Sequence, residues 1–185
     1  MTTKGHYPIA PAERLSSLRQ IIDKKGFARV IEAHSGLSGI VAETAQLEVG
    51  GTSTEYDALW ESSLTDSASK GLPDASIVGT ESRLHTVNEI LHVTRKPMIV
   101  DGDTGGEIPQ FEFLITSLER FGVSSVIIED KAYPKRNSLD NSASQSLEIP
   151  EKFAEKIEAG KKVTLSDDFM IVARLESLIA GTGLE

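Results

Sequence analysis

The amino-acid sequence predicts an α/β fold in which parallel strands alternate with helices. Short runs of β-branched apolar residues recur along the chain, and longer segments with helical spacing of apolar residues separate them. This alternation is typical of βα units that build a parallel sheet. The 185 residues are 39% hydrophobic and 25% charged, which is ordinary for one globular domain or a piece of a larger one.

The first half of the chain contains two predicted helices and two predicted strands. Residues 11–24 place leucine and isoleucine at helical spacing, and Gly26 ends this helix. We expect residues 29–33 to form a first strand, residues 37–49 a second helix, and residues 56–60 a second strand.

The second half continues the same alternation. Residues 82–93 carry one apolar stripe and are predicted to be helical. Residues 97–100 and 125–128 are the third and fourth predicted strands, and between them lies a helix over residues 109–121 with Pro in its first turn. The last two expected elements are a helix and a fifth strand: residues 150–159 and residues 169–173.

Charged residues gather where the predicted strands end. Functional residues of parallel βα folds belong at the carboxyl ends of the strands, which share one edge of the sheet. Two long connections also follow strands, at residues 61–81 and 130–149. Connections of that length in a compact domain are usually functional or disordered.

Two aspartates follow the third predicted strand. Asp101 and Asp103 stand two residues apart, just before glycines that let backbone N–H groups approach a phosphate or carboxylate. A solvated turn would use the same residue types. Glu129 at the end of the next strand favours a magnesium site, because Mg²⁺ prefers oxygen ligands and keeps several waters.

The segment from Glu129 to Ser138 is denser in charge than a strand end needs. It holds two carboxylates and three cations: Lys131, Lys135 and Arg136. Such a mixture suits a magnesium ion and a phosphoryl group better than a packing interface.

Three further residues have weaker local signals. Arg174 ends the fifth predicted strand, where it can clamp a carboxylate or phosphoryl oxygen or form a salt bridge with Glu176 or Glu129. Asp74 follows Pro73, a pair that mostly marks turns. His34 lies near a strand end, but a lone histidine is more often structural.

Composition argues against several classes of function. A net charge of −9 argues against nucleic-acid binding, and the lack of cysteine excludes disulfides, zinc–thiolate sites and a cysteine nucleophile in this chain. No apolar run approaches the length of a membrane span, and residues 1–7 lack the apolar core of a signal peptide. No dinucleotide fingerprint or P-loop is present. We therefore expect a cytoplasmic protein without nucleic-acid or membrane partners.

The segment Glu129-Asp130-Lys131, followed after five intervening residues by Asn137-Ser138, resembles a known signature. It is similar to the EDK-x5-NS motif of the phosphoenolpyruvate mutase and isocitrate lyase superfamily, and the resemblance extends from about residue 14 to residue 185. It implies a (β/α)8 barrel, of which residues 1–185 would form roughly the first five βα units, as the N-terminal portion of one barrel domain.

The resemblance also implies roles for individual residues. The magnesium ligands would be Asp101, Asp103 and Glu129. The catalytic residues would be Asp74, Lys135, Asn137 and Arg174, with the loop around Lys135 to Ser138 acting as a gate. The substrate-binding residues would be Trp60, Ser62, Ser63, Leu64, Asn137, Ser138 and Arg174.

The chain departs from the family pattern in three respects. Glu61 and Ser63 stand where relatives often have Gly, and Gly106-Glu107 replaces a common Tyr-Gly. A barrel of this kind needs about 200 residues or more, so we expect the chain to be a fragment of one.

The implied activity is the interconversion of phosphoenolpyruvate and 3-phosphonopyruvate with Mg²⁺, in a protein that is a homo-oligomer. Phosphonopyruvate hydrolases share the carboxylates but tend to lack the residue held here by Asn137. Isocitrate and methylisocitrate lyases use a catalytic cysteine, which this chain lacks. Oxaloacetate hydrolases stay open, and so does a role of another class, a non-catalytic fragment or assembly module.

Overall fold

A computed structural model describes residues 9–140 and 145–183, so the polar residues 1–7 lie outside the described part. Its main sheet has five parallel strands in the order β1-β4-β5-β6-β7. The strands are β1 (Val30–Glu32), β4 (Ala58–Glu61), β5 (Met98–Asp101), β6 (Ser125–Glu129) and β7 (Met170–Arg174). All five predicted strands are thereby confirmed, and each pairs with its predecessor among them.

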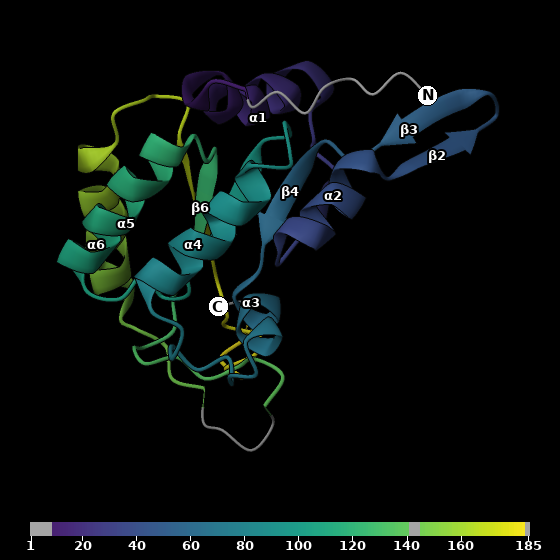
Figure 1. Cartoon of the computed structure of the whole chain (residues 1–185). Coiled ribbons are helices and arrows are strands. Elements are labelled where there is room, and N and C mark those ends of the chain that lie inside the picture. Colours follow the sequence, from purple (N-terminus) through teal and green to yellow (C-terminus); the bar gives the residue numbers. More distant parts are fainter. Residues whose placement is uncertain (1–8, 141–144, 184–185) are drawn as a thin grey trace.

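Helices lie along one face of this sheet (Figure 1). In chain order they are α2 (Gly36–Thr44), α4 (Thr80–Leu91), α5 (Ile108–Phe121) and α6 (Pro150–Val163). Neighbouring helices contact one another, α2 with α4, α4 with α5, and α5 with α6. The predicted helices over residues 82–93, 109–121 and 150–159 are confirmed, with ends that differ by a few residues.

The hydrophobic core lies between the sheet and these helices. Alternate strand residues point to the helix side, so Leu59, Val100 and Val126 are fully buried there, in one core cluster with apolar residues of α4 and α5. Residues between them on the strands, such as Trp60 and Ile99, lie on the other face and are half-buried. The alternation fixes which side chains near the strand ends face the helices.

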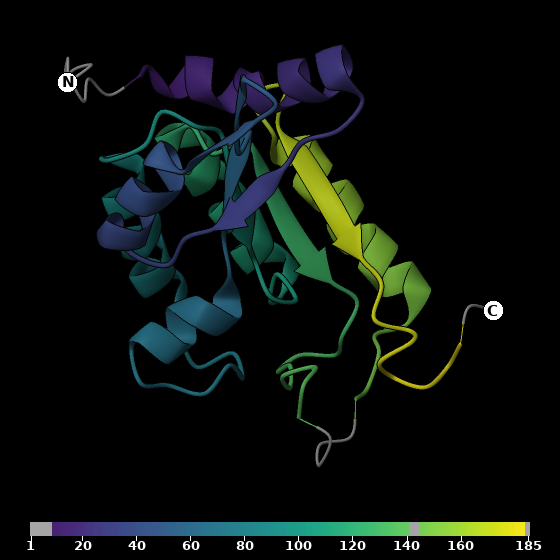
Figure 2. The same cartoon turned by 90° about the vertical axis from the view of Figure 1, so that its right-hand side faces the viewer.

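The first helix, α1 (Pro11–Lys25), lies across the amino ends of the strands (Figures 1 and 2). Its buried Arg14 donates from Nη2 to the carbonyl oxygens of Leu91 and Thr94, each at 3.2 Å. Ser124, just before β6, donates from Oγ to the Arg14 carbonyl at 2.9 Å. These contacts close the amino end of the sheet, and the long loops all lie at the opposite, carboxyl end.

The expected helix over residues 37–49 is wrong in its second half. α2 ends at Thr44, and the chain then forms an antiparallel hairpin of β2 (Gln46–Val49) and β3 (Thr52–Glu55). Gly50 and Gly51 both have positive φ, as a two-residue hairpin turn requires. Polar and apolar residues alternate along β2, and this period of two together with the Gly-Gly turn outweighs helical spacing.

The two long connections contain structure of their own. The first holds α3 (Ser63–Ser69), a short helix that the sequence analysis did not predict. In the second, the N–H of Ala132 donates to Ser146 O at 2.9 Å, and the N–H of Glu148 donates to Asp130 O at 2.8 Å. This loop therefore leaves β6 and returns beside its own start. Among the described residues, no helix is long and apolar enough to cross a membrane.

Candidate active site

The turn after β5 is tied to the neighbouring strand. Asp103 has a φ of 55°, a left-handed backbone that Asp tolerates better than most residues. Its N–H donates to Asp101 Oδ1 at 3.0 Å, and its carbonyl accepts from the N–H of Glu129 at 2.8 Å. The two aspartates and Glu129 are thereby held together at adjacent strand ends, as the sequence predicts.

Arg174 joins three carboxylates at this edge. It lies directly opposite Glu129 in the strand register and forms an ion pair with that residue through Nη2. Nη1 lies 3.3 Å from Asp101 Oδ2, and Nε lies 2.9 Å from Glu176 Oε1. The sequence left two roles open for Arg174, a clamp for substrate oxygens or a salt bridge. The structure contains salt bridges, and these place the guanidinium within the carboxylate cluster.

Burial and ion pairing oppose each other at these side chains. Burial alone raises the pKa of Asp101, but Arg174 and Lys135 outweigh burial and hold this pKa below its usual value. At Glu129 burial wins and the pKa is raised despite Lys135 and Arg174. Burial lowers the pKa of Arg174, but the surrounding carboxylates raise it further than burial lowers it.

Lys135 enters the cluster from the long loop after β6. Its side chain is 3% exposed, and its Nζ lies 2.5 Å from Asp103 Oδ1 and 2.9 Å from Asp74 Oδ1. It also donates to Ser63 Oγ at 2.9 Å. Burial alone would lower the pKa of Lys135, but the aspartates more than offset this effect and raise it.

Hydrogen bonds join the loop that carries Asp74 to the loop that carries Asn137. Asn137 Nδ2 donates to Asp74 Oδ2 at 2.8 Å, and the N–H of Lys135 donates to Ser76 Oγ at 3.2 Å. The Asn137 side chain also accepts, through Oδ1, from the N–H of Leu139 at 2.7 Å. The amide group is therefore held at both ends, with its NH₂ directed at Asp74.

Ser138 lies on the other side of the same loop. Its Oγ donates to Glu176 Oε2 at 2.9 Å and receives a hydrogen bond from Lys131 Nζ at 2.5 Å. The loop is thus attached to the end of β7 through Glu176 and to the end of β5 through Lys135.

Of the four residues around α3 that were predicted to bind substrate, only Ser63 contacts the carboxylate cluster within the described structure. Ser63 joins the cluster, since its Oγ donates to Asp101 Oδ2 at 3.1 Å. Trp60 lies half-buried on β4, and its buried Nε1 has no hydrogen-bond partner within the described structure. Ser62 is buried at the start of α3, and Leu64 is 40% exposed. None of these last three has a hydrogen bond or ion pair to the carboxylate cluster in the described residues.

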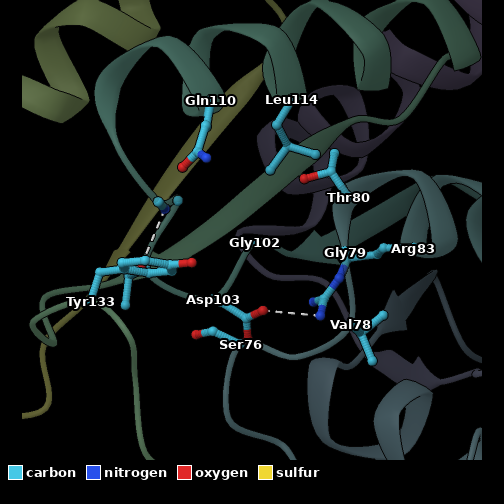
Figure 3. A pocket seen from close by; sticks show the side chains of 13 residues that line it. Ser76, Val78, Gly79, Thr80, Arg83, Gly102, Asp103, Gln110, Leu114 and Tyr133 are labelled. Atoms are coloured by element: carbon cyan, nitrogen blue, oxygen red, sulfur yellow. Dashed lines mark hydrogen bonds and ion pairs between the residues drawn. The ribbon is translucent and has the colours of Figure 1, made fainter.

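Sequence analysis missed Arg83 on α4. Arg83 is 4% exposed, donates from Nη1 to the carbonyl oxygen of Asp101, and approaches Asp103 Oδ2 at 3.0 Å from Nη2 (Figure 3). A cation inside the apolar stripe of an expected helix is the only signal that could have revealed it. Its partner becomes visible only when α4 packs against the end of β5.

A cavity of about 250 Å³ adjoins Asp103 on the helix side. Arg83 and Thr80 of α4 line one wall, Gln110 of α5 lines another, and Tyr133 of the long loop lies across from Arg83 (Figure 3). The cavity is lined by both polar and apolar groups, and it shares Asp103 with the carboxylate cluster.

The carboxylates do not form a ready-made metal site. In the part of the chain that the structure describes, no three His, Cys, Asp or Glu side chains come close enough together to hold an ion. Asp101, Asp103 and Glu129 are each paired with Arg174, Lys135 or Arg83 instead. Glu129 Oε1 nevertheless is buried and has no hydrogen-bond partner among the described residues, so this hard oxygen donor of the cluster is unused there.

Comparison with known proteins identifies the family. A family profile described as "Phosphoenolpyruvate phosphomutase" matches residues 18–185. The chain belongs to this family. A phosphoenolpyruvate phosphomutase from Tetrahymena pyriformis is 34% identical over 173 residues, which are 93% of this chain and 55% of that protein.

Solved structures agree in fold. A phosphoenolpyruvate phosphomutase from Streptomyces platensis subsp. rosaceus superimposes with a TM-score of 0.81 at 36% identity, over 90% of this chain and 55% of the other. A phosphonopyruvate hydrolase in complex with oxalate and Mg²⁺ superimposes with a TM-score of 0.78 at 31% identity, over 92% and 55% of the two chains. The five parallel strands and the helices between them therefore belong to the barrel of this superfamily. The chain spans about half the length of the relatives it matches.

Proposed function

We propose that the protein containing this chain interconverts phosphoenolpyruvate and 3-phosphonopyruvate. The observation that carries the proposal is the closed loop, in which Asn137 donates to Asp74 while Lys135 bridges Asp74 and Asp103. This arrangement directs an amide donor and an ammonium group at the strand ends and covers them. The likeness to phosphomutases of both the sequence and the fold supports the same reaction.

The reaction is an isomerisation. The P–O bond to the enol oxygen of phosphoenolpyruvate breaks, and carbon 3 of the resulting pyruvate enolate supplies the electron pair for the new P–C bond. Arg174 would hold carboxylate or phosphoryl oxygens, since a guanidinium binds such groups in a bidentate manner. Asn137 would donate to the transferring group, and Asp74 would orient that group or accept it transiently.

Magnesium is the proposed cofactor. Asp101, Asp103 and Glu129 supply only hard oxygen donors. The Glu129 Oε1 atom, which has no hydrogen-bond partner in the described structure, is free to coordinate the ion. Mg²⁺ commonly uses one or two carboxylates together with water and substrate oxygens, so the set need not enclose the ion. When bound, the ion would neutralise charge on the enolate and carboxylate oxygens of the substrate.

The loop from Lys135 to Leu139 would exclude water during transfer. Water that captured the phosphoryl group would yield phosphate and pyruvate instead of an isomer. The contacts of this loop with Asp74, Ser76 and Glu176 support a closed position over the strand ends.

We further propose that residues 1–185 are the N-terminal portion of one barrel domain in a cytoplasmic homo-oligomer. Phosphonopyruvate hydrolysis is the second candidate reaction, because a hydrolase matches nearly as well in structure as the phosphomutase does. The lyases of the superfamily are less favoured, since the chain has no cysteine.

A coupled assay separates the candidates. The intact protein is supplied with phosphonopyruvate and Mg²⁺, and NADH oxidation is followed with lactate dehydrogenase alone or with pyruvate kinase and ADP added. A phosphomutase produces a signal only when pyruvate kinase is present, whereas a hydrolase produces one with lactate dehydrogenase alone. A signal that does not need pyruvate kinase, or no signal in either mixture, would contradict the proposed function.

A further inference from the structure

Glu32 ends β1 at the carboxyl edge of the sheet, where the candidate active site lies. It stands opposite Trp60 of β4 in the strand register, so both side chains point to the face away from the core helices. The Glu32 side chain is half-buried, and both of its carboxylate oxygens have partners. A paired carboxylate therefore lies next to one of the residues expected to bind substrate.

Thr65 connects this carboxylate to α3. Its Oγ1 donates to Glu32 Oε1 at 2.6 Å. A hydrogen bond that ends on a charged group is shorter and stronger than one between neutral groups. Thr65 stands two residues after Ser63 in the first turn of α3, so this bond attaches the start of that helix to the end of β1.

His34 is the second partner of the carboxylate. Its Nδ1 lies 3.0 Å from Glu32 Oε1 and 3.2 Å from Oε2. An ionised carboxylate only accepts hydrogen bonds, so the ring nitrogen that faces it carries a proton. The turn that carries the ring is itself held, because the N–H groups of His34 and Ser35 both donate to Ser38 Oγ at 2.9 Å, within the N-terminal cap of α2.

The position of α3 depends on such contacts. The helix has only seven residues, three of them serine, and a helix this short and polar is not stable without partners. Ser63 bonds to Asp101 at the end of β5, and Asp66 bonds to Thr86 of α4. The bond to Glu32 adds β1, so the start of α3 is attached to three separate elements.

We propose that Glu32 is a positioning residue, which His34 orients and which fixes the first turn of α3 through Thr65. Through this turn it sets where the Ser63 hydroxyl lies at the strand ends. Without the bond to Glu32, the start of α3 is free to shift while Asp66 still holds the helix to α4. The effect on substrate binding rests on the proposed function, whereas the contacts themselves do not.

A double-mutant cycle on the intact protein tests the contact without any activity. Thr65→Val replaces the hydroxyl by a methyl group, Glu32→Ala removes the acceptor, and urea unfolding compares both variants and their combination with the wild type. We expect the combination to lose less than the sum of the two single losses, because either substitution already breaks the bond. Thr116→Val, whose hydroxyl bonds to the carbonyl of Phe113 in its own helix, is the matched control and should add to Glu32→Ala. Additive losses for Thr65→Val and Glu32→Ala would overturn the proposal.

Nitrogen-15 NMR of the histidine side chains tests the second partner. The chain has four histidines, so comparison with His34→Gln assigns the signals of this ring. Once the ring is neutral, His34 of the wild type should keep its proton on Nδ1, which faces the carboxylate, and Glu32→Ala should lose that preference. A proton on Nε2 in the wild type, or the same tautomer in Glu32→Ala, would overturn the part assigned to His34.

Steady-state kinetics with phosphonopyruvate supplies the readout for positioning. KM should rise about tenfold in Thr65→Val and in Glu32→Ala, with a smaller change in kcat, because the turn that they release binds substrate. Thr65→Ser keeps the hydroxyl and should retain a KM close to that of the wild type. An unchanged KM in Thr65→Val and Glu32→Ala would overturn the positioning role. A wild type without turnover would count against the proposed function, while the unfolding cycle and the NMR spectra still decide whether Glu32 holds α3.

Discussion

At the scale of residues, the candidate active site is a set of carboxylates neutralised by cations of the same chain. Arg174, Lys135 and Arg83 approach it from β7, from the long loop and from α4. Each cation bridges at least two elements, so the same contacts that balance charge also fix the loop and the strand ends. Substitutions at these residues should therefore affect both stability and chemistry, and each effect needs its own measurement.

Asn137→Ala is expected to reduce kcat for phosphonopyruvate about a hundredfold, the typical loss when one donor to a transferring group is removed. It should also increase the share of phosphate and pyruvate among the products, because the loop loses its bond to Asp74. Steady-state kinetics with product analysis is the measurement. Leu139→Ala, in the same loop but 76% exposed, is the matched control. Unchanged kcat in Asn137→Ala would exclude the proposed role.

Lys135→Ala is expected to lower the free energy of unfolding by about 3 kcal/mol, because it leaves Asp74 and Asp103 buried without their common partner. Urea unfolding measures this difference. Lys162→Ala removes only a fully exposed pair with Glu158, so its urea midpoint should stay close to that of the wild type. Equal effects of the two substitutions would mean that Lys135 is not held in the cluster.

Some of these site residues could be predicted from the sequence, and others could not. Asp101, Asp103 and Glu129 were predictable because adjacent parallel strands place their carboxyl ends together. Arg83 was not, since its approach from the helix side depends on the packing of α4. The contact of Asp66 with Thr86 was also beyond the sequence, because it depends on the position of α3, which was not predicted.

At the scale of elements, strongly patterned segments were predicted well. The five strands and the helices with an apolar stripe need only local periodicity, and the structure contains them. Strand β2 was mistaken for the end of a helix because residues 45–49 continue the apolar positions of α2. α3 was missed because a seven-residue helix rich in serine has almost no periodic signal.

Helix ends offer a matched test of close packing. Gly26 and Gly122 follow α1 and α5 with nearly the same φ, 78° and 79°. A Cβ at Gly26 would meet nothing within 4 Å, whereas one at Gly122 would lie 2.5 Å from backbone atoms of Pro11. Gly26→Ala should cost about 1 kcal/mol, and Gly122→Ala about 2 kcal/mol more.

Urea unfolding of these two glycine variants measures the difference. Because backbone strain is common to both sites, the excess at Gly122 reports the contact between α1 and the end of α5. Equal losses in the two variants would show that α1 does not pack there.

At the scale of the whole molecule, the fold brings every long loop to the carboxyl end of one parallel sheet (Figure 2). Residues from four separate parts of the chain meet there: Ser63, Asp101, Lys135 and Arg174. A ligand that binds at these strand ends should therefore stabilise all of these elements together.

Magnesium should stabilise the protein measurably. At about 100 times the dissociation constant, an ion that binds only the folded state adds about 2.7 kcal/mol, which corresponds to a Tm increase of about 5 to 10 °C. Calorimetry with and without chelator is the measurement. Asp101→Asn should abolish the increase, and the exposed Asp167→Asn should preserve it. A Tm that does not respond to Mg²⁺ would contradict the proposed metal ligands.

The most direct test of the central claim is the fate of the phosphoryl group in water enriched in oxygen-18. The intact protein is given phosphonopyruvate and Mg²⁺, and phosphorus NMR identifies the product and the isotope shift of its phosphorus signal. We predict phosphoenolpyruvate without solvent oxygen, because the closed loop keeps water from the transferring group. Inorganic phosphate that carries one oxygen-18 would contradict the account and identify the protein as a hydrolase.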